Sequence, residues 1–260
     1  MKSLTHYYHG ARRRLMGHIG PKVRTAMTEW GDNMEVIMPG GYPIWQWGHL
    51  SDYEYSLQKF IELHLKPDDT FVDAGAHVGY FSVLANHLCR EVYAFEPTPE
   101  VFEVLKRNAH GRNIKTRNYA LSDINGSIFM FSHKIPGSGA NSKYFNRGNA
   151  VKSAVRTIRL DDVVPKADFI KIDVEGMEFE ILRGAERILR ECHPVVAAEA
   201  LEETGMVLIG RMCLYMEELG YTTYQLSKEG LISRYYGDFV PQSNMLIFNF
   251  NLEKEESKTP

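Results

Sequence analysis

Cysteine is scarce in this sequence, and long apolar runs are missing. The 260 residues include three cysteines, Cys89, Cys192 and Cys213. Their wide spacing is not that of a zinc site, and an odd number cannot all pair within one chain, so we expect free thiols in a reducing compartment. No segment approaches the roughly 20 apolar residues that span a bilayer, and the first residues lack the apolar core of a secretory signal. The sequence therefore predicts a cytoplasmic protein without stable membrane insertion.

Net charge is also small, because 30 basic side chains stand against 33 acidic ones and leave a formal net charge of −3. A chain so balanced has no overall attraction to nucleic acid or to an anionic membrane. The exception is the N-terminus, where six basic residues precede the first acidic one, Glu29. They could form a patch for a phosphate-bearing or membrane-surface partner. We favour a solvated helix packed on the edge of the domain.

Strands and helices alternate along most of the chain. Apolar runs predict seven strands, at 70–73, 91–96, 115–120, 168–173, 194–199, 221–226 and 245–250. Helical spacing of apolar residues predicts helices over 53–65, 79–89, 98–109, 177–191 and 203–219. Such alternation gives a parallel sheet with helices on both faces. Residues 227–244 join the last two strands without a helical pattern, which predicts an antiparallel final strand.

The chain divides into three parts. Residues 1–50 form an N-terminal extension with a basic helix and a short β or irregular segment, in which Pro39-Gly40-Gly41 marks a turn. Residues 51–252 form one α/β domain, interrupted at 126–160 by two strands of antiparallel character and a glycine-containing loop. The polar tail 253–260 is expected to be disordered.

The first strand of the domain runs directly into a turn in which Asp73, Gly75 and Gly79 form the pattern D-x-G-x-x-x-G. Glycine removes the side chain where the backbone turns sharply and approaches a ligand, and ligands of open parallel sheets bind beyond the carboxyl ends of strands. A dinucleotide site would instead read G-x-G-x-x-G around a pyrophosphate, which the carboxylate of Asp73 would repel. Asp73 suits a ligand with a cationic amine, and S-adenosylmethionine carries both an ammonium and a sulfonium group.

Further carboxylates follow the other predicted strands. Glu96 could accept hydrogen bonds from the hydroxyl groups of a ribose. Asp123 could bind an adenine amino group, or could equally be a turn or cap residue. Asp173 and Glu175 leave one strand two residues apart toward the same cleft, an arrangement expected where cations are bound or protons are handled. Glu199 ends the next strand and could face this cleft.

Together these motifs resemble the FkbM-type methyltransferases. The resemblance rests on the runs F-V-D-A-G-A-H-V-G-Y-F-S, V-Y-A-F-E-P-T-P-E, A-L-S-D and D-F-I-K-I-D-V-E-G-M-E-F-E-I-L-R-G-A, in this order. It covers about residues 53–250 and implies the class I methyltransferase fold, a doubly wound, Rossmann-like α/β sheet of seven mostly parallel strands. It also implies S-adenosylmethionine as methyl donor and O-methylation of a sugar, a glycolipid or a natural product. His77 stands where many relatives look to carry Asn.

The predicted cofactor-binding residues are therefore Asp73, Gly75, His77, Gly79, Glu96, Asp123 and Asp173. An acceptor hydroxyl must also lose its proton, and a positioned base contributes about 10²–10⁴-fold. Glu175 is the first candidate for this base, although it could equally satisfy backbone amides at a helix N-terminus. Glu199 is the second candidate, with His77 in reserve. A magnesium ion on Asp173, Glu175 and Glu199 ranks below a base, because nothing in the sequence fixes their geometry.

Three other functions fit the sequence less well. A nicotinamide-dependent oxidoreductase needs the glycine pattern that is missing here, and no Tyr-x-x-x-Lys pair stands out. A non-catalytic scaffold would not need to keep the acidic residues and glycines named above. A nucleic-acid methyltransferase would show a basic surface with interleaved aromatics or an N-P-P-Y type motif. We expect a small-molecule or glycan acceptor, chosen by the loop 134–153 and the first 50 residues, and no nucleic-acid partner.

Overall fold

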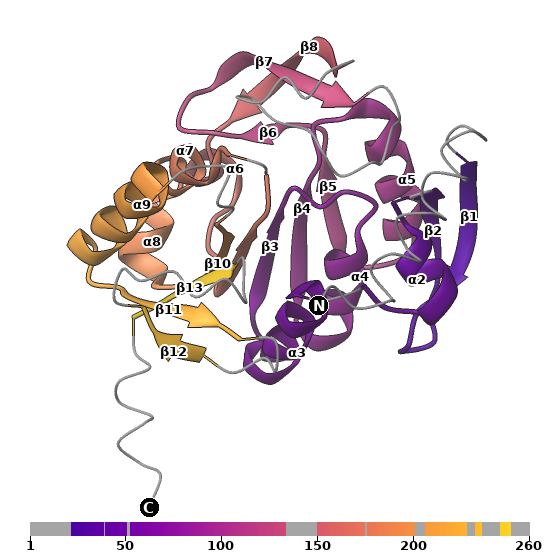
Figure 1. Cartoon of the computed structure of the whole chain (residues 1–260), viewed down its shortest axis with the longest axis horizontal. Coiled ribbons are helices and arrows are strands. Elements are labelled where there is room, and N and C mark those ends of the chain that lie inside the picture. The colour runs from indigo at the N-terminus through magenta and orange to yellow at the C-terminus, as the bar shows by residue number, and fades with distance from the viewer. Residues whose placement is uncertain are drawn as a thin grey trace, which may run out of the picture.

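A central sheet of eight strands organises the molecule (Figure 1). The computed structural model describes residues 22–38, 40–50, 53–133, 150–174, 176–200, 206–227, 232–235 and 245–250. The strand order is β12-β11-β13-β10-β9-β3-β4-β5. The strands are β3 (Thr70–Ala74), β4 (Glu91–Phe95), β5 (Ile114–Arg117), β9 (Phe169–Ile172), β10 (Val195–Glu199), β11 (Thr222–Leu226), β12 (Ile232–Arg234) and β13 (Met245–Asn249). Neighbours from β5 to β10 are parallel, whereas β13 is antiparallel to both β10 and β11.

This sheet confirms the predicted doubly wound fold and its antiparallel final strand. The expected number of seven strands is one too low, because β12 adds three residues at the edge beside β11. So short a strand shows no alternating pattern in a sequence. The expected strand 115–120 is also wrong in its second half. Asn118 donates from Nδ2 to the backbone oxygens of Glu96 and Pro97, at 2.8 and 3.1 Å, and the chain leaves the main sheet there.

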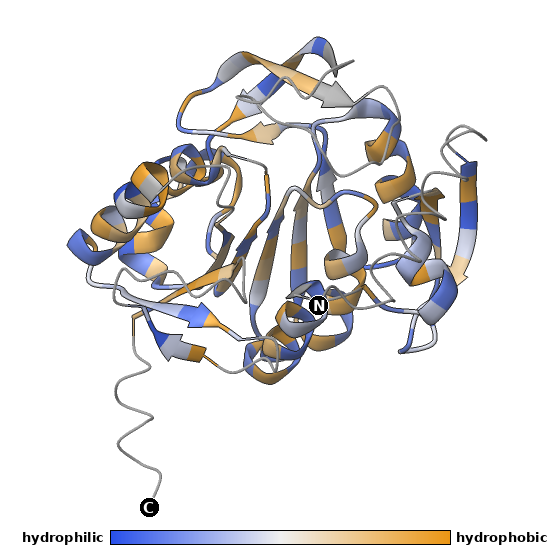
Figure 2. Ribbon diagram, viewed as in Figure 1, coloured by the Kyte–Doolittle hydropathy of each residue, from blue (hydrophilic) through white to orange (hydrophobic). Residues whose placement is uncertain are grey.

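Helices cover both faces of the sheet, as the alternation predicted. One face carries α3 (Tyr53–His64), α4 (Tyr80–Leu88) and α5 (Pro99–Ala109), and the other carries α6 (Leu160–Val163), α7 (Glu178–Gly184), α8 (Glu186–Cys192) and α9 (Met206–Glu218). Successive strand residues point to opposite faces. Phe71 and Phe169 therefore pack with the first group of helices, while Val72 and Ile170 pack with the second. Figure 2 shows apolar residues on the strands and on the helices that flank them.

The expected single helix over 177–191 is two helices, with a break at Ala185. The first N–H groups of a helix have no partner within it. The carboxylate of Asp161 accepts hydrogen bonds from the backbone N–H groups of Arg187 and Ile188, at 2.9 and 3.1 Å, so the second helix begins against α6. Periodicity cannot detect such a break, because both helices bury residues of the same core.

The N-terminal region begins with a hairpin of β1 (Lys22–Met27) and β2 (Asn33–Met38), which pair antiparallel. It continues into α2 (Tyr42–Trp47), where β or irregular structure was expected. A proline in the first turn and Gly48 at the C-terminal end, with a φ of 80°, are ordinary signals for a short helix. The predicted basic helix lies mostly outside the described residues, and its last part, from residue 22, is the strand β1.

This hairpin shares the core of the α/β domain. Met34, Val36 and Ile37 of β2 are buried, as is Ile44 of α2, and all four belong to the apolar cluster beneath α3, α4 and α5. In Figure 1 the hairpin lies outside α5, on the right of the sheet. Residues 22–50 are therefore packed as part of the domain, not as a separate unit.

A second, smaller sheet crosses the upper end of the molecule in Figure 1. It consists of β6 (Ala120–Leu121), β8 (Ala150–Ile158) and β7 (Gly126–His133) in that order, with β7 and β8 antiparallel as predicted. Residues 134–149 and the tail from 251 lie outside the described residues. Within the described part of the chain, no helix has the length and apolar character needed to cross a membrane.

The packing of α7 against the β6 loop predicts opposite effects of one substitution at two helical glycines. Alanine normally stabilises a helix by about 0.5–1 kcal/mol relative to glycine, and we expect this for Gly210→Ala, where a Cβ meets nothing within 4 Å. At Gly184 the Cβ would lie 2.0 Å from the backbone oxygen of Ser122, so Gly184→Ala should cost about 1–3 kcal/mol. Urea unfolding measures both. Stabilisation by both substitutions would contradict this packing.

Candidate active site

The carboxyl ends of three parallel strands meet where the strand order reverses. β3 pairs with β4 on one side and with β9 on the other. Asp73 of β3 stands level with Ala94 of β4 and with Lys171 of β9. In open α/β sheets, ligands bind in the crevice at such a switch point.

The turn after β3 brings these strand ends into direct contact. The backbone N–H groups of Gly75 and Ala76 donate to the carbonyl oxygen of Phe95, at the end of β4, at 3.0 and 2.9 Å. Gly75 has a φ of 76°, and a Cβ at this position would lie 2.0 Å from the backbone oxygen of Asp173. Any side chain is therefore excluded by both backbone conformation and space.

The same turn contains two more left-handed residues, His77 with a φ of 52° and Gly79 with a φ of 92°. A Cβ at Gly79 would lie 2.6 Å from Leu105 Cδ1, so this turn also packs closely against α5. Among residues other than glycine, Asn, Asp and His are the ones enriched in the left-handed region. This conformation accounts for a histidine at a position that the resemblance assigns to asparagine.

A buried lysine at the switch point was not predicted from the sequence. Lys171 Nζ lies 3.3 Å from Asp73 Oδ1, 3.3 Å from Asp173 Oδ2 and 3.2 Å from the backbone oxygen of Gly75. Burial alone lowers the pKa of Lys171, but the two carboxylates raise it, and the net shift is upward. The lysine is therefore charged. A lysine inside the apolar strand F-I-K-I was the signal that could have identified it.

The two aspartates paired with Lys171 differ in depth. Asp73 is fully buried and also accepts a hydrogen bond from Ser82 Oγ at 2.6 Å. The side chain of Asp173 is 31% exposed. Burial raises the pKa of Asp173, but the charge of Lys171 and a hydrogen bond with Glu199 lower it, and the net shift is downward. An ionised Asp173 thus lies at the surface of the site, with the buried Glu199 beside it.

Glu96 lies immediately after β4 and is also buried. Its Oε2 accepts a hydrogen bond from the backbone N–H of His77 at 3.1 Å, and its Oε1 accepts one from that of Thr98 at 2.8 Å. Burial raises the pKa of Glu96 by more than these hydrogen bonds lower it. Because each carboxylate oxygen has two lone pairs, Glu96 keeps acceptor capacity for a hydroxyl group.

A second residue missed by sequence reasoning is Glu178, at the start of α7. It is buried, and its Oε1 accepts a hydrogen bond from the backbone N–H of Gly176 at 3.0 Å. Burial raises the pKa of Glu178 to about 7, although its backbone hydrogen bonds oppose this. The second glutamate of D-V-E-G-M-E was a signal for it. Glu175, the first glutamate of that run, lies outside the described residues.

Asp123 stands apart from this group. It follows β6, and its Oδ2 lies 3.3 Å from Arg183 Nη1 on α7. Its other oxygen lies 3.3 Å from Ser122 Oγ. The structure thus brings together Asp73, Gly75, His77, Glu96, Asp173 and Glu199, and places Asp123 against α7. Within the described ranges, no three His, Cys, Asp or Glu side chains are grouped so that they could hold a metal ion.

Comparison with known proteins matches the region that forms this site. A model of the methyltransferase FkbM domain matches residues 73–223. The hexuronic acid methyltransferase AglP of Haloferax volcanii is 32% identical over 137 residues, which are 50% of this chain and 55% of that protein. The 31-O-demethyl-FK506 methyltransferase FkbM of Streptomyces tacrolimicus is 28% identical over 160 residues, 60% of this chain and 58% of that protein. The chain thus spans somewhat more than half the length of these relatives.

A crystal structure of methyltransferase FkbM from Methylobacillus flagellatus is 19% identical, covering 70% of this chain and 43% of that one with a TM-score of 0.47. The domain match alone includes the Asp73–Gly79 turn, Glu96 and the run from Lys171 to Glu178, and extends over more than half of the sequence. The chain therefore belongs to the methyltransferase FkbM family.

Proposed function

We propose that this methyltransferase moves a methyl group from S-adenosylmethionine to a hydroxyl group of a sugar, a glycolipid or a natural product. The observation that carries the proposal is the set of carboxylates around the Gly75 turn, where β3, β4 and β9 end together. It offers acceptors for the hydroxyl and ammonium groups of the donor. The donor, when bound, supplies a methyl group activated by a sulfonium.

The donor fits the chemistry of the residues present. Glu96 would accept hydrogen bonds from the ribose hydroxyl groups, and the ionised, partly exposed Asp173 would face the ammonium group. The absence of a side chain at Gly75 would let the donor approach the backbone of the turn closely. We propose that Asp73 acts indirectly through Lys171, because it is fully buried. Asp123 remains a proposed contact for the adenine amino group, alongside its ion pair with Arg183.

The acceptor proton needs a base, and Glu175 remains our first candidate. In the sequence it stands between Val174 and Gly176, and the backbone N–H of Gly176 donates a hydrogen bond to Glu178. Glu199 is the second candidate. Its hydrogen bond with Asp173 requires a shared proton, so in that state Glu199 would orient Asp173 and could not accept a proton. A magnesium ion remains the less favoured alternative.

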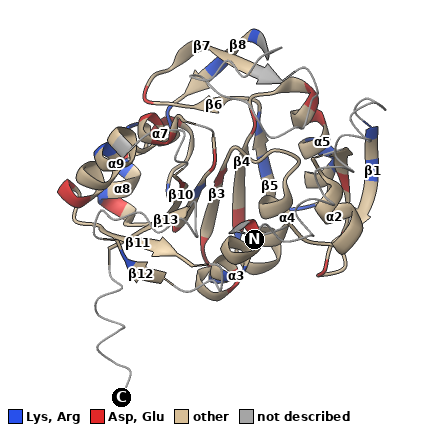
Figure 3. Cartoon of the chain, in the orientation of Figure 1, with Lys and Arg blue, Asp and Glu red and all other residues tan. Residues whose placement is uncertain are grey.

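Acidic sugars are the acceptors that we would test first. The relative from Haloferax volcanii is named for hexuronic acid. On the exposed side of β8, Lys152 Nζ lies 4.2 Å from the ring centre of Phe129, and Arg156 Cζ lies 4.5 Å from that of Tyr119. Figure 3 shows basic residues of β8 in blue. An arginine whose guanidinium lies over a ring can bind a carboxylate through two parallel hydrogen bonds.

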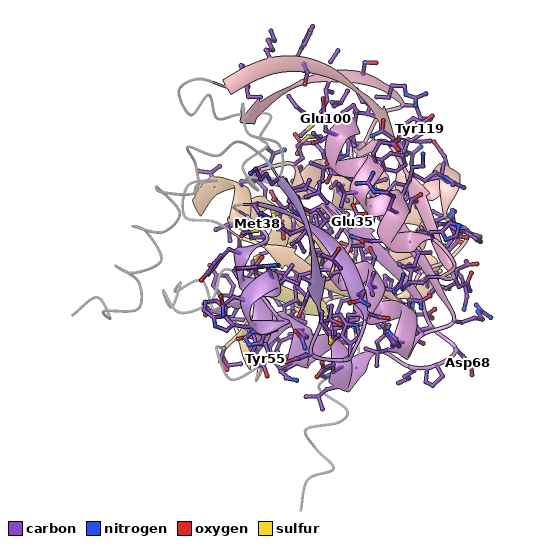
Figure 4. All side chains as sticks on the ribbon, turned by 90° about the vertical axis from the view of Figure 1, so that its right-hand side faces the viewer. Glu35, Met38, Tyr55, Asp68, Glu100 and Tyr119 are labelled. Carbon is purple, nitrogen blue, oxygen red and sulfur yellow. The ribbon has the colours of Figure 1, made fainter. Side chains whose placement is uncertain are left out.

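Donor binding can be tested by calorimetric titration with S-adenosylmethionine and, separately, with NAD. We expect the wild type to bind only S-adenosylmethionine. Glu96→Gln should bind it about 10–100-fold more weakly, because one of the two oxygens that would accept hydrogen bonds from the ribose becomes an NH2 group. The matched control is Glu100→Gln, which changes an exposed residue of α5 (Figure 4) and should leave affinity unchanged. Binding of NAD instead, or equal affinity in both variants, would contradict the proposed donor site.

Methyl transfer to hydroxylated sugars, with uronic acids included, tests the base. Glu175→Gln should lower kcat by about 10²–10⁴-fold with unchanged affinity for S-adenosylmethionine, because a positioned base is lost. Radioactive methyl transfer under saturating donor measures this, with Glu199→Gln in parallel. Near-normal turnover of Glu175→Gln would dismiss it as the base. Loss of activity upon exhaustive chelation would favour the metal alternative.

The buried Glu178 predicts a pH-dependent stability. The unfolded chain releases this proton near pH 4.5 and the folded chain near pH 7, so the free energy of unfolding should fall as pH rises between these values and level off above. In the wild type, this fall in the free energy of unfolding should be about 3 kcal/mol at most, and it should be absent in Glu178→Gln. Urea unfolding at pH 5 and pH 8 measures it, with Glu191→Gln on the exposed side of α8 as control. An equal fall in wild type and Glu178→Gln would refute the assignment.

A further inference from the structure

One buried amide connects the N-terminal hairpin to the turn of the proposed donor site. Asn108, in the last turn of α5, is buried. Its Oδ1 accepts a hydrogen bond from the backbone N–H of Glu35 at 2.7 Å, and its Nδ2 donates to the backbone oxygen of Glu35 at 2.8 Å. The second hydrogen of Nδ2 goes to the backbone oxygen of Val78 at 2.7 Å.

The contact with Glu35 replaces a neighbouring strand. β1 and β2 form a sheet of two strands, so the outer edge of β2 presents backbone groups that need partners. The amide of Asn108 supplies one acceptor and one donor to the same residue, as an adjacent strand would. Glu35 lies in the middle of the face that Figure 4 presents, where β2 crosses in front of the helices. Its backbone N–H can only donate, so the orientation of the amide is fixed.

The contact with Val78 reaches the turn between β3 and α4. Val78 stands between His77 and Gly79, both of which have positive φ. The backbone N–H of His77 donates to Glu96. In the same turn, Gly75 packs closely against the backbone of Asp173. A shift of the Val78 carbonyl therefore changes the positions of the groups that we propose for the donor. Asn108 is thus in contact with the hairpin and with this turn at the same time.

We propose that Asn108 is a positioning residue that couples docking of the hairpin to binding of S-adenosylmethionine. The inference rests on the proposed donor. Asn108 lies within the family match, whereas the hairpin lies outside it, because β2 ends at Met38 and the match begins at residue 73. Coupling between two sites is reciprocal. Donor binding therefore stabilises the hairpin, and a docked hairpin strengthens donor binding.

The adjacent residue provides a matched control. Arg107 also attaches α5 to Glu35, since its Nε and Nη2 lie 2.9 and 2.7 Å from Glu35 Oε2. This ion pair is half-exposed and its hydrogen bonds go to the side chain of Glu35. Arg107→Ala therefore weakens attachment of the hairpin without removing the hydrogen bond to Val78. Asn108→Asp keeps the acceptor for the Glu35 amide but loses both donated hydrogen bonds.

The test combines calorimetry with amide hydrogen exchange of Glu35, followed by NMR with and without S-adenosylmethionine. In the wild type, the donor should slow exchange of this amide. Asn108→Asp should bind the donor about tenfold more weakly, because a buried hydrogen bond to the turn is lost, and should lose the protection. Arg107→Ala should bind the donor within about twofold of the wild-type affinity, and the donor should still slow exchange of the Glu35 amide.

The outcomes separate the two proposals. If the wild type does not bind S-adenosylmethionine, the proposed function fails. If it binds but exchange of the Glu35 amide is unchanged, the donor assignment stands and the coupling is refuted. This second result needs only the wild type, so the coupling stays testable even if Asn108→Asp does not fold. Equal loss of affinity in both variants would refute the positioning role of Asn108, because it would show that any loosening of the hairpin weakens donor binding.

Discussion

The charge of Lys171 is the constraint on which the rest of the site depends. A buried ammonium group is tolerated only among acceptors that compensate its loss of hydration. Here Asp73 comes from β3, Asp173 from the end of β9, and the third acceptor is the backbone oxygen of Gly75. β9 cannot slide along β3 without leaving one of these charges unpaired. The register of the two central strands and the position of the glycine turn are therefore set by one contact.

Depth below the surface separates the acidic residues of the site into different roles. Asp73 is enclosed and serves Lys171 and Ser82, whereas Asp173 shares the same lysine but remains open to solvent on one side. Glu96 and Glu178 are both buried, and the carboxylate of each accepts hydrogen bonds from backbone N–H groups of a turn. Carboxylates that look alike in the sequence thus differ in whether a ligand can reach them.

Much of the fold follows from the sequence, because buried parallel strands are apolar runs and their flanking helices have clear periodicity. The strand that contains Asp73 and the strand that Asp173 follows could be identified in this way, and with them the turn at Gly75. The missed features depend on contacts between distant segments. Lys171 is visible as a lysine within an apolar strand, but its pairing with Asp73 is not, and the break at Ala185 depends on Asp161. Likewise, no local pattern indicates that Asn108 pairs with Glu35 across 73 positions.

The way in which the smaller sheet is attached has a consequence for how this protein can diversify. The chain leaves the main sheet at Asn118, forms β6, β7 and β8, and returns at β9 without adding a strand to the eight. Insertions or deletions between β7 and β8 therefore change no strand register in the main sheet. The same holds for changes in residue type on the exposed side of β8. Natural selection, or a directed-evolution library, can vary this region while Lys171 and its partners stay as they are.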